Sequence, residues 1–207
     1  MEEIIGYIPP VTKYIAGSAL LISVLCTLQF LDEADLFFDV DQIIVKHEFW
    51  RLITSFLYFG SFGFSTFLHL FALFHHSKTL EVMIFHGQMA EFLWFIFLSW
   101  SLILLIAPYF NMIFLSESFF MCILYLISKK NREGRFALLG LPIVVPNSFL
   151  PYLFLAFGVE KDKVIGMVIA HLFYFLEDIV PNLPTSKDWR ILKPPGFMKS
   201  LAGFISG

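Results

Sequence analysis

The chain alternates between long apolar runs and short polar segments, and this pattern predicts membrane-spanning helices. A helix needs roughly 20 residues to cross a hydrocarbon layer of about 30 Å. Six runs are candidates for such helices, namely residues 14–31, 52–74, 92–110, 112–128, 136–157 and 164–180. We therefore predict an all-α membrane protein with six transmembrane helices. Residues 1–180 would form one membrane domain, and residues 181–207 would form a short tail.

Two of the predicted spans contain residues that disturb a helix. Gly60 and Gly63 lie in the first half of the second span, and Pro142, Pro146 and Pro151 interrupt the fifth. Each proline removes a backbone donor and kinks the helix. Such breaks are tolerated in lipid when neighbouring protein or water satisfies the freed backbone groups.

The segment between the first two spans is too polar to cross the membrane. Residues 36–50 mix aromatic and aliphatic side chains with charged ones. This mixture favours a position in the membrane interface, with Trp50 at the level of the headgroups and Arg51 reaching water or phosphate. An ordinary loop outside the membrane is the alternative.

The composition supports a membrane protein and excludes other classes. Hydrophobic residues make up 58% of the chain, the mean hydropathy is +0.78, and only 15% of residues are charged, against about 25% in soluble domains. The net charge of −3 argues against nucleic-acid binding. Cys26 and Cys122 both lie in apolar runs, so they do not suggest disulfides. We expect neither a metal nor a cofactor.

The distribution of charge predicts how the chain is oriented in the membrane. The loop "KKNREGR" at residues 129–135 carries four Lys/Arg, and the tail carries Lys187, Arg190, Lys193 and Lys199. The segment after the first span instead carries six acidic residues. Six crossings put both termini on one side of the membrane, and because cytosolic loops are enriched in Lys and Arg, we predict that this side is the cytosol.

Ionisable residues inside the predicted spans are the first candidates for function, because such residues are rare in membranes. His69, Glu117 and His171 fall in the second, fourth and sixth spans. We predict that they line a polar cavity that opens toward the lumenal side. Hydrogen bonds between helices are the simpler explanation for the two histidines.

A serine adds a possible chemistry to this cavity. Ser116 lies about 6 Å into the fourth span and His171 about 10 Å into the sixth, at 1.5 Å per residue. A serine and a histidine at similar depth on different helices is the arrangement of an intramembrane serine protease.

Several stretches carry a resemblance to a known family. They are "IPPVTKYI", "EFWRLITSFLYFGSFGF" with Trp50, Arg51, Gly60 and Gly63, "LYLISKKN", "GMVIAHLFYFLEDIVPN" with Gly166 and His171, and "RILKPP". With these stretches the chain resembles the derlin family, the proteolytically inactive branch of the rhomboid superfamily, nearly from end to end.

The resemblance implies a six-span, rhomboid-like bundle in the membrane of the endoplasmic reticulum. It also implies a role in moving misfolded proteins out for ubiquitination and proteasomal degradation. A multi-span RING ubiquitin ligase is the partner that this role requires. Several derlins end in an arginine-containing box that binds an AAA ATPase. The end of this chain, "KPPGFMKSLAGFISG", has no such arginine, so we expect the link to the ATPase to be indirect.

Comparison with active rhomboids argues against catalysis. Their G-x-S-G motif corresponds here to Phe114, Leu115, Ser116 and Glu117, which lack both glycines. Glu117 would also place negative charge beside a developing oxyanion. The H-x-x-x-N pair of rhomboids becomes Ser65 and His69.

We therefore interpret Ser116, His69 and His171 as vestigial positions and expect no enzyme activity. Two alternatives are kept beside this interpretation. The first is an active rhomboid protease that uses Ser116 and His171. The second is a small transporter, which the broken fifth span suggests and the absence of an obvious inverted repeat weakens.

Overall fold

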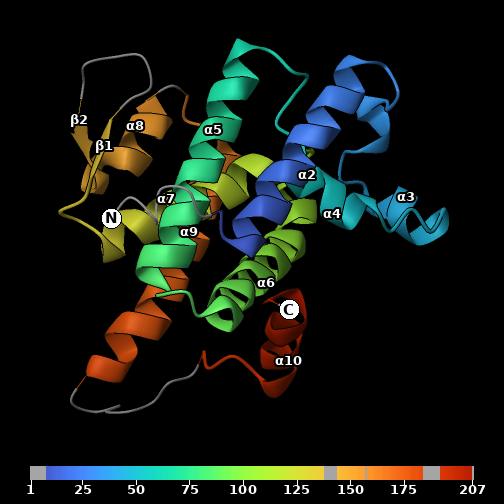
Figure 1. The fold of residues 1–207 in the computed structure, drawn as a ribbon. Coiled ribbons are helices and arrows are strands. Elements are labelled where there is room, and N and C mark those ends of the chain that lie inside the picture. Colours follow the sequence, from blue (N-terminus) through green and yellow to red (C-terminus); the bar gives the residue numbers. More distant parts are fainter. Residues whose placement is uncertain (1–7, 138–143, 157, 184–191, 207) are drawn as a thin grey trace.

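The computed structural model of the protein describes all residues except 1–7, 138–143, 157, 184–191 and 207. Helices make up most of this part of the chain (Figure 1). The helices are α2 (Pro10–Thr27), α3 (Val40–Val45), α4 (Arg51–Leu57), α5 (Phe64–Thr79), α6 (Met89–Ile106), α7 (Ser116–Lys130), α8 (Leu150–Ala156), α9 (Lys161–Tyr174) and α10 (Gly196–Ser206). Two short strands, β1 (Arg135–Ala137) and β2 (Val144–Pro146), complete these elements.

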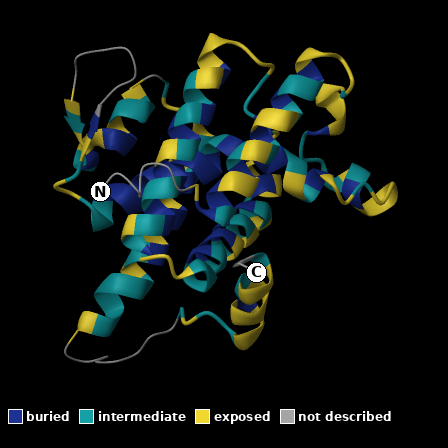
Figure 2. Cartoon of the chain, in the orientation of Figure 1, coloured by how far each residue is buried: buried dark blue, intermediate teal, exposed yellow. Residues whose placement is uncertain are grey.

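Helix α7 forms the centre of the bundle. Every residue of α7 from Ser118 to Ser128 is buried, and the helix lies in the dark-blue centre of the molecule in Figure 2. Helices α4, α5, α6, α8 and α9 all pack against it. A helix that is buried on all sides is apolar on every face. Its sequence therefore does not indicate which helices pack against it.

Three helical segments are long and apolar enough to cross a membrane, by length and composition. They are Pro10–Thr27, Met89–Phe110 and Lys161–Asn182, and they correspond to the first, third and sixth predicted spans. The last of these begins as α9 and continues through a π-helical turn, Phe175–Ile179, and a 3-10 turn, Val180–Asn182. By length and composition these segments are those of a helical membrane protein, and they account for three of the six predicted spans within the described residues.

The second predicted span is not one helix, so the prediction of a continuous span at 52–74 is wrong. Helix α4 ends at Leu57, and α5 begins at Phe64. Between them Gly60 has φ +107°, a conformation that side-chain-bearing residues rarely adopt. Helix α5 then extends beyond the predicted end through a π-helical turn, Leu80–Ile84.

The prediction of a helical fifth span at 136–157 is also wrong. Strands β1 and β2 form an antiparallel hairpin in which Arg135 pairs with Pro146. A 3-10 turn, Asn147–Phe149, follows, and the only α-helix described in this region is the seven-residue α8. Proline lacks a backbone donor, which suits the edge position of Pro146 in the hairpin and disfavours a helix there. The predicted break at Pro142 lies outside the described residues.

A carboxylate from the end of α5 fixes the start of α2. The buried side chain of Glu81 accepts hydrogen bonds from the backbone N–H of Val11 at 3.1 Å and of Thr12 at 2.8 Å. It also accepts one from the hydroxyl of Thr12 at 2.7 Å. The first N–H groups of a helix have no partner within the helix, so Glu81 satisfies donors that would otherwise be unpaired.

The segment predicted as a tail contains a helix that packs on the bundle. Helix α10 lies against α6, and Met198 on α10 is buried (Figure 1). The ring of Phe197 meets the indole of Trp94 edge to face, with 6.4 Å between the ring centroids. Leu192, ahead of α10, packs against the hydrophobic core.

Candidate functional site

The candidate site is the contact between α7 and α9, which run parallel through the centre of the bundle. The hydroxyl of Ser118 donates to the backbone carbonyl of Asp162 at 2.7 Å. The thiol of Cys122 donates to the backbone carbonyl of Gly166 at 3.1 Å. These two bonds join small side chains on one face of α7 to the backbone of α9, and they set the register between the helices.

The close approach of the two helices depends on Gly166. A Cβ atom built on this glycine would overlap the carbonyl group and Cα of Ser118. Because these are backbone atoms, the contact cannot be relieved by a change of side-chain rotamer. Small residues allow membrane helices to approach in this way. Gly166 was identified from the sequence as a family residue, and the structure gives it this packing role.

His171 lies further along the same contact. Its Nδ1 is 2.7 Å from the hydroxyl of Tyr125, and the two rings meet edge to face. Tyr125 is buried, whereas His171 is exposed at the bundle surface. The hydrogen bond between helices that we considered for His171 is therefore present. Tyr125 was missed by the sequence reasoning, because nothing in its local pattern distinguishes it from a core aromatic residue.

The structure does not bring Ser116 and His171 together. Ser116 is buried at the first position of α7, two residues before the residue that bonds to Asp162. Tyr125, the partner of His171, comes nine residues later, about 13.5 Å along the helix. The prediction of similar depth is wrong, because it measured each helix from its own apolar start. The register set by Gly166 decides the alignment instead.

His69 and Glu117 do come together, between α5 and α7. His69 Nε2 lies 4.0 Å from Glu117 Oε1, and both side chains are half-buried. The ring of His69 also meets the ring of Phe120 edge to face. Of the three residues predicted to line a polar cavity, His69 and Glu117 lie close together, whereas His171 lies at another level against Tyr125.

Arg51 holds the segment between α2 and α4 in place. Its buried guanidinium donates to the backbone carbonyls of Ala34 at 2.7 Å and Phe37 at 3.1 Å. It also bonds to the carboxylate of Glu48 at 2.6 Å and lies 3.8 Å from that of Asp35. A planar guanidinium with five donors suits this arrangement, in which acceptors approach from several directions.

Trp50 and Glu33 add further bonds to the same segment. The indole of Trp50 donates to the backbone carbonyl of Asp35 at 3.2 Å. Ser61 donates to the carboxylate of Glu33 at 2.7 Å. Hydrogen bonds from Tyr58 and Ser61 lower the pKa of Glu33 below its ordinary value. The two glycines on either side of Ser61 differ in conformation, because Gly60 has a positive φ whereas Gly63 is extended ahead of α5.

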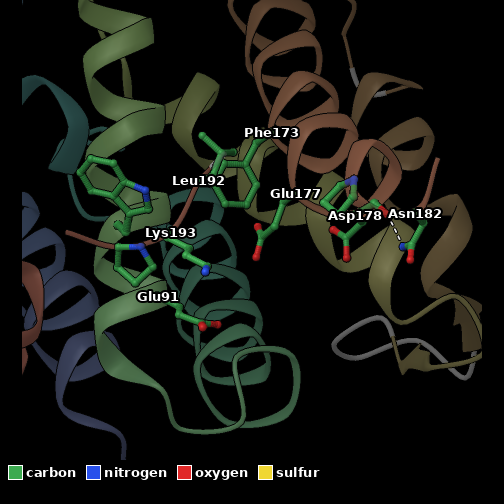
Figure 3. Close-up of a pocket in the computed structure, with 10 residues that line it drawn as sticks. Glu91, Phe173, Glu177, Asp178, Asn182, Leu192 and Lys193 are labelled. Carbon is green, nitrogen blue, oxygen red and sulfur yellow. Dashed lines mark hydrogen bonds between the residues drawn. The ribbon is translucent and has the colours of Figure 1, made fainter. Parts of the chain in front are cut away.

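A polar pocket of about 310 Å³ opens at the C-terminal end of α9 (Figure 3). Its charged lining residues are Glu91, Glu177, Asp178 and Lys193. Lys130 at the end of α7 lies 3.6 Å from Glu177 and 3.1 Å from Asp178. The sequence reasoning missed this pocket, although the acidic pair at the end of the sixth span and the lysine in the tail were visible signals.

Among the described residues these contacts can bind and orient polar groups, and they place His171 against Tyr125 rather than against Ser116. The residues define a helical membrane protein with a tight α7–α9 contact and a half-buried histidine–carboxylate pair.

The chain belongs to the Der1-like family, whose sequence pattern matches residues 8–195. It is 30% identical to Derlin-2.1 of Zea mays over 97% of this chain and 86% of that protein. It is 31% identical to a probable derlin-2 homolog of Dictyostelium discoideum over 94% of this chain and 80% of that protein. Derlin-2.2 of Arabidopsis thaliana is 28% identical over 97% of this chain and 87% of its own length.

Proposed function

We propose that this protein is a non-enzymatic component of endoplasmic-reticulum-associated degradation. It resides in the membrane of the endoplasmic reticulum and helps misfolded proteins move from the lumen or the membrane to the cytosol. Membership of the Der1-like family supports this role. A RING ubiquitin-ligase complex is the partner that receives the substrate, and an AAA ATPase acts through that complex.

The observation that carries the proposal is the pairing of His171 with Tyr125. In a serine protease the histidine must lie within hydrogen-bond reach of the nucleophile. The register of α7 and α9 instead aligns Ser116 with the beginning of α9. A rhomboid-like bundle with this register keeps polar groups in the membrane without a catalytic pair.

The pair of His69 and Glu117 supplies polar contacts in an otherwise apolar bundle. Half-exposed polar side chains lower the cost of holding a polar polypeptide segment beside them, because they replace some of its lost hydrogen bonds to water. We infer that this pair contacts the unfolded substrate during its passage.

A degradation assay tests the function and the absence of catalysis together. The protein is produced in cells that lack their own derlins, and the half-life of a misfolded substrate is measured. We expect Ser116→Ala to restore degradation as fully as the original chain. Ser101→Ala, at an exposed position of α6, is the matched control. The double variant His69→Leu/Glu117→Leu should leave the protein abundant but lengthen the substrate half-life.

Two results would contradict the proposal. The first is cleavage of a rhomboid model substrate by the purified protein that disappears with Ser116→Ala. The second is a substrate half-life that is the same in cells without any derlin as in the same cells producing this chain.

The orientation of the chain has its own test. We place the loop at residues 129–135 and the tail in the cytosol because of their Lys and Arg residues, and an even number of crossings puts the N-terminus on the same side. A glycosylation acceptor inserted beside the exposed Asp35 should therefore be modified in the endoplasmic reticulum, and one inserted beside Asn131 should not. The opposite pattern of modification would reverse the proposed orientation.

A further inference from the structure

Helix α10 presents three different faces along its length. Met198, Ala202 and Ile205 recur at helical spacing and are the buried or half-buried residues of the helix. Since α10 packs on α6, these residues form its packing face. Lys199, Ser200 and Gly203 form an exposed face that carries the one charged residue described on this helix. The third face is both apolar and exposed.

This third face consists of Phe197, Leu201 and Phe204, which recur at intervals of four and three residues. Their exposed fractions are 59%, 44% and 87%. Three large apolar side chains in one row on an eleven-residue helix would be costly in water, because their surface would stay hydrated. A helix with one such face and one polar face is typical of a segment that lies at a membrane surface.

The face continues the outer surface of α6. Phe197 contacts Trp94 of α6, and Trp94 stacks on Phe97 with 5.5 Å between the ring centroids. Phe97 is 48% exposed and belongs to the segment Met89–Phe110, which is long and apolar enough to cross a membrane. The exposed residues of such a segment meet lipid, so the neighbouring Phe197 is placed at the same lipid surface.

We propose that α10 is embedded in the lipid leaflet that surrounds the start of α6, with Phe197, Leu201 and Phe204 in contact with acyl chains. This is the cytosolic leaflet in the proposed orientation. The inference goes beyond the proposed role in degradation and does not depend on it.

Cysteine labelling tests whether lipid covers this face. The protein is placed in nanodiscs of phosphatidylcholine, which expose both membrane surfaces. The native Cys26 and Cys122 are buried, so the unaltered chain gives the background. Phe204→Cys and Leu201→Cys probe the apolar face, and Lys199→Cys and Ser200→Cys are the matched controls on the polar face. A membrane-impermeant maleimide should react at least about tenfold more slowly at the apolar face, because a thiol surrounded by hydrocarbon does not ionise.

Denaturation in dodecyl sulfate should bring all four variants to the same labelling rate, which shows that the difference depends on the folded state in lipid. Equal rates for Phe204→Cys and Lys199→Cys in the nanodiscs would overturn the proposal, because the apolar face would then be in water. Protection of Phe204→Cys in cell membranes but not in nanodiscs would also overturn it, because a protein partner would then cover the face. Neither result bears on substrate degradation, so the proposed function is tested separately.

Discussion

Replacing Gly166 by alanine should destabilise the protein more than the same change at any other glycine of its described helices. The new Cβ would overlap backbone atoms of Ser118, so α7 and α9 would have to move apart. Overpacking of this kind costs about 1–3 kcal/mol of unfolding free energy, and more where the backbone itself must shift. The hydrogen bond from Cys122 to the carbonyl of Gly166 would lengthen as well. Thermal unfolding of the purified protein in detergent measures the effect.

Gly17→Ala is the matched control for this substitution. Gly17 also lies within a helix, α2, but a Cβ atom built there meets nothing within 4 Å. Alanine favours a helix over glycine by about 1 kcal/mol, so this variant should be as stable as the original chain or slightly more stable. Equal melting temperatures for Gly166→Ala and Gly17→Ala would show that the α7–α9 contact is not as close as described.

Arg51→Ala should release the segment between α2 and α4. The substitution leaves the carbonyls of Ala34 and Phe37 without their donor and Glu48 without its ion pair. Arg51 is buried but Glu48 is partly exposed, so the loss should fall below the cost of breaking a fully buried ion pair, which is about 3–5 kcal/mol. We expect a lower melting temperature and rapid proteolysis within residues 32–49, measured by mass spectrometry of the fragments.

Two further variants, one at Arg51 and one elsewhere in the segment that it holds, separate the effect of charge from that of geometry. Arg51→Lys keeps the charge but cannot reach several acceptors with one planar group, so its loss of stability should be intermediate. Lys46→Ala removes a cation from an exposed position of the same segment and should change stability by less than about 0.5 kcal/mol. If Arg51→Ala resists proteolysis as well as Lys46→Ala does, the contacts of Arg51 do not hold the segment.

The extent to which the fold could be predicted depended on the kind of signal that each element carries. The first, third and sixth spans were found because hydropathy reports directly on a helix that faces lipid. The helix α7 was found at residues 116–130, slightly displaced from the predicted 112–128. The fifth span failed because an apolar run rich in proline can form a hairpin, and hydropathy does not distinguish the two.

The candidate site was harder to predict, because its geometry depends on how helices align with one another. The hydrogen bond between Tyr125 and His171 follows from the register of α7 and α9, which Gly166 and Ser118 set through a backbone contact. No local pattern reports such a register. Arg51 and Gly166 could be named from a family resemblance, but the acceptors of Arg51 lie as far as 17 residues away along the chain.

The contact between Glu81 and the start of α2 has a consequence for the order in which the protein is made. Thr12 and Glu81 are 69 residues apart, so α2 leaves the ribosome long before its acceptor has been synthesised. The first helix must therefore enter the bilayer with its leading amides bound to water or lipid headgroups. It reaches its final position only when Glu81, in the turn that follows α5, is in place to accept these bonds, so biogenesis fixes the start of α2 after α5.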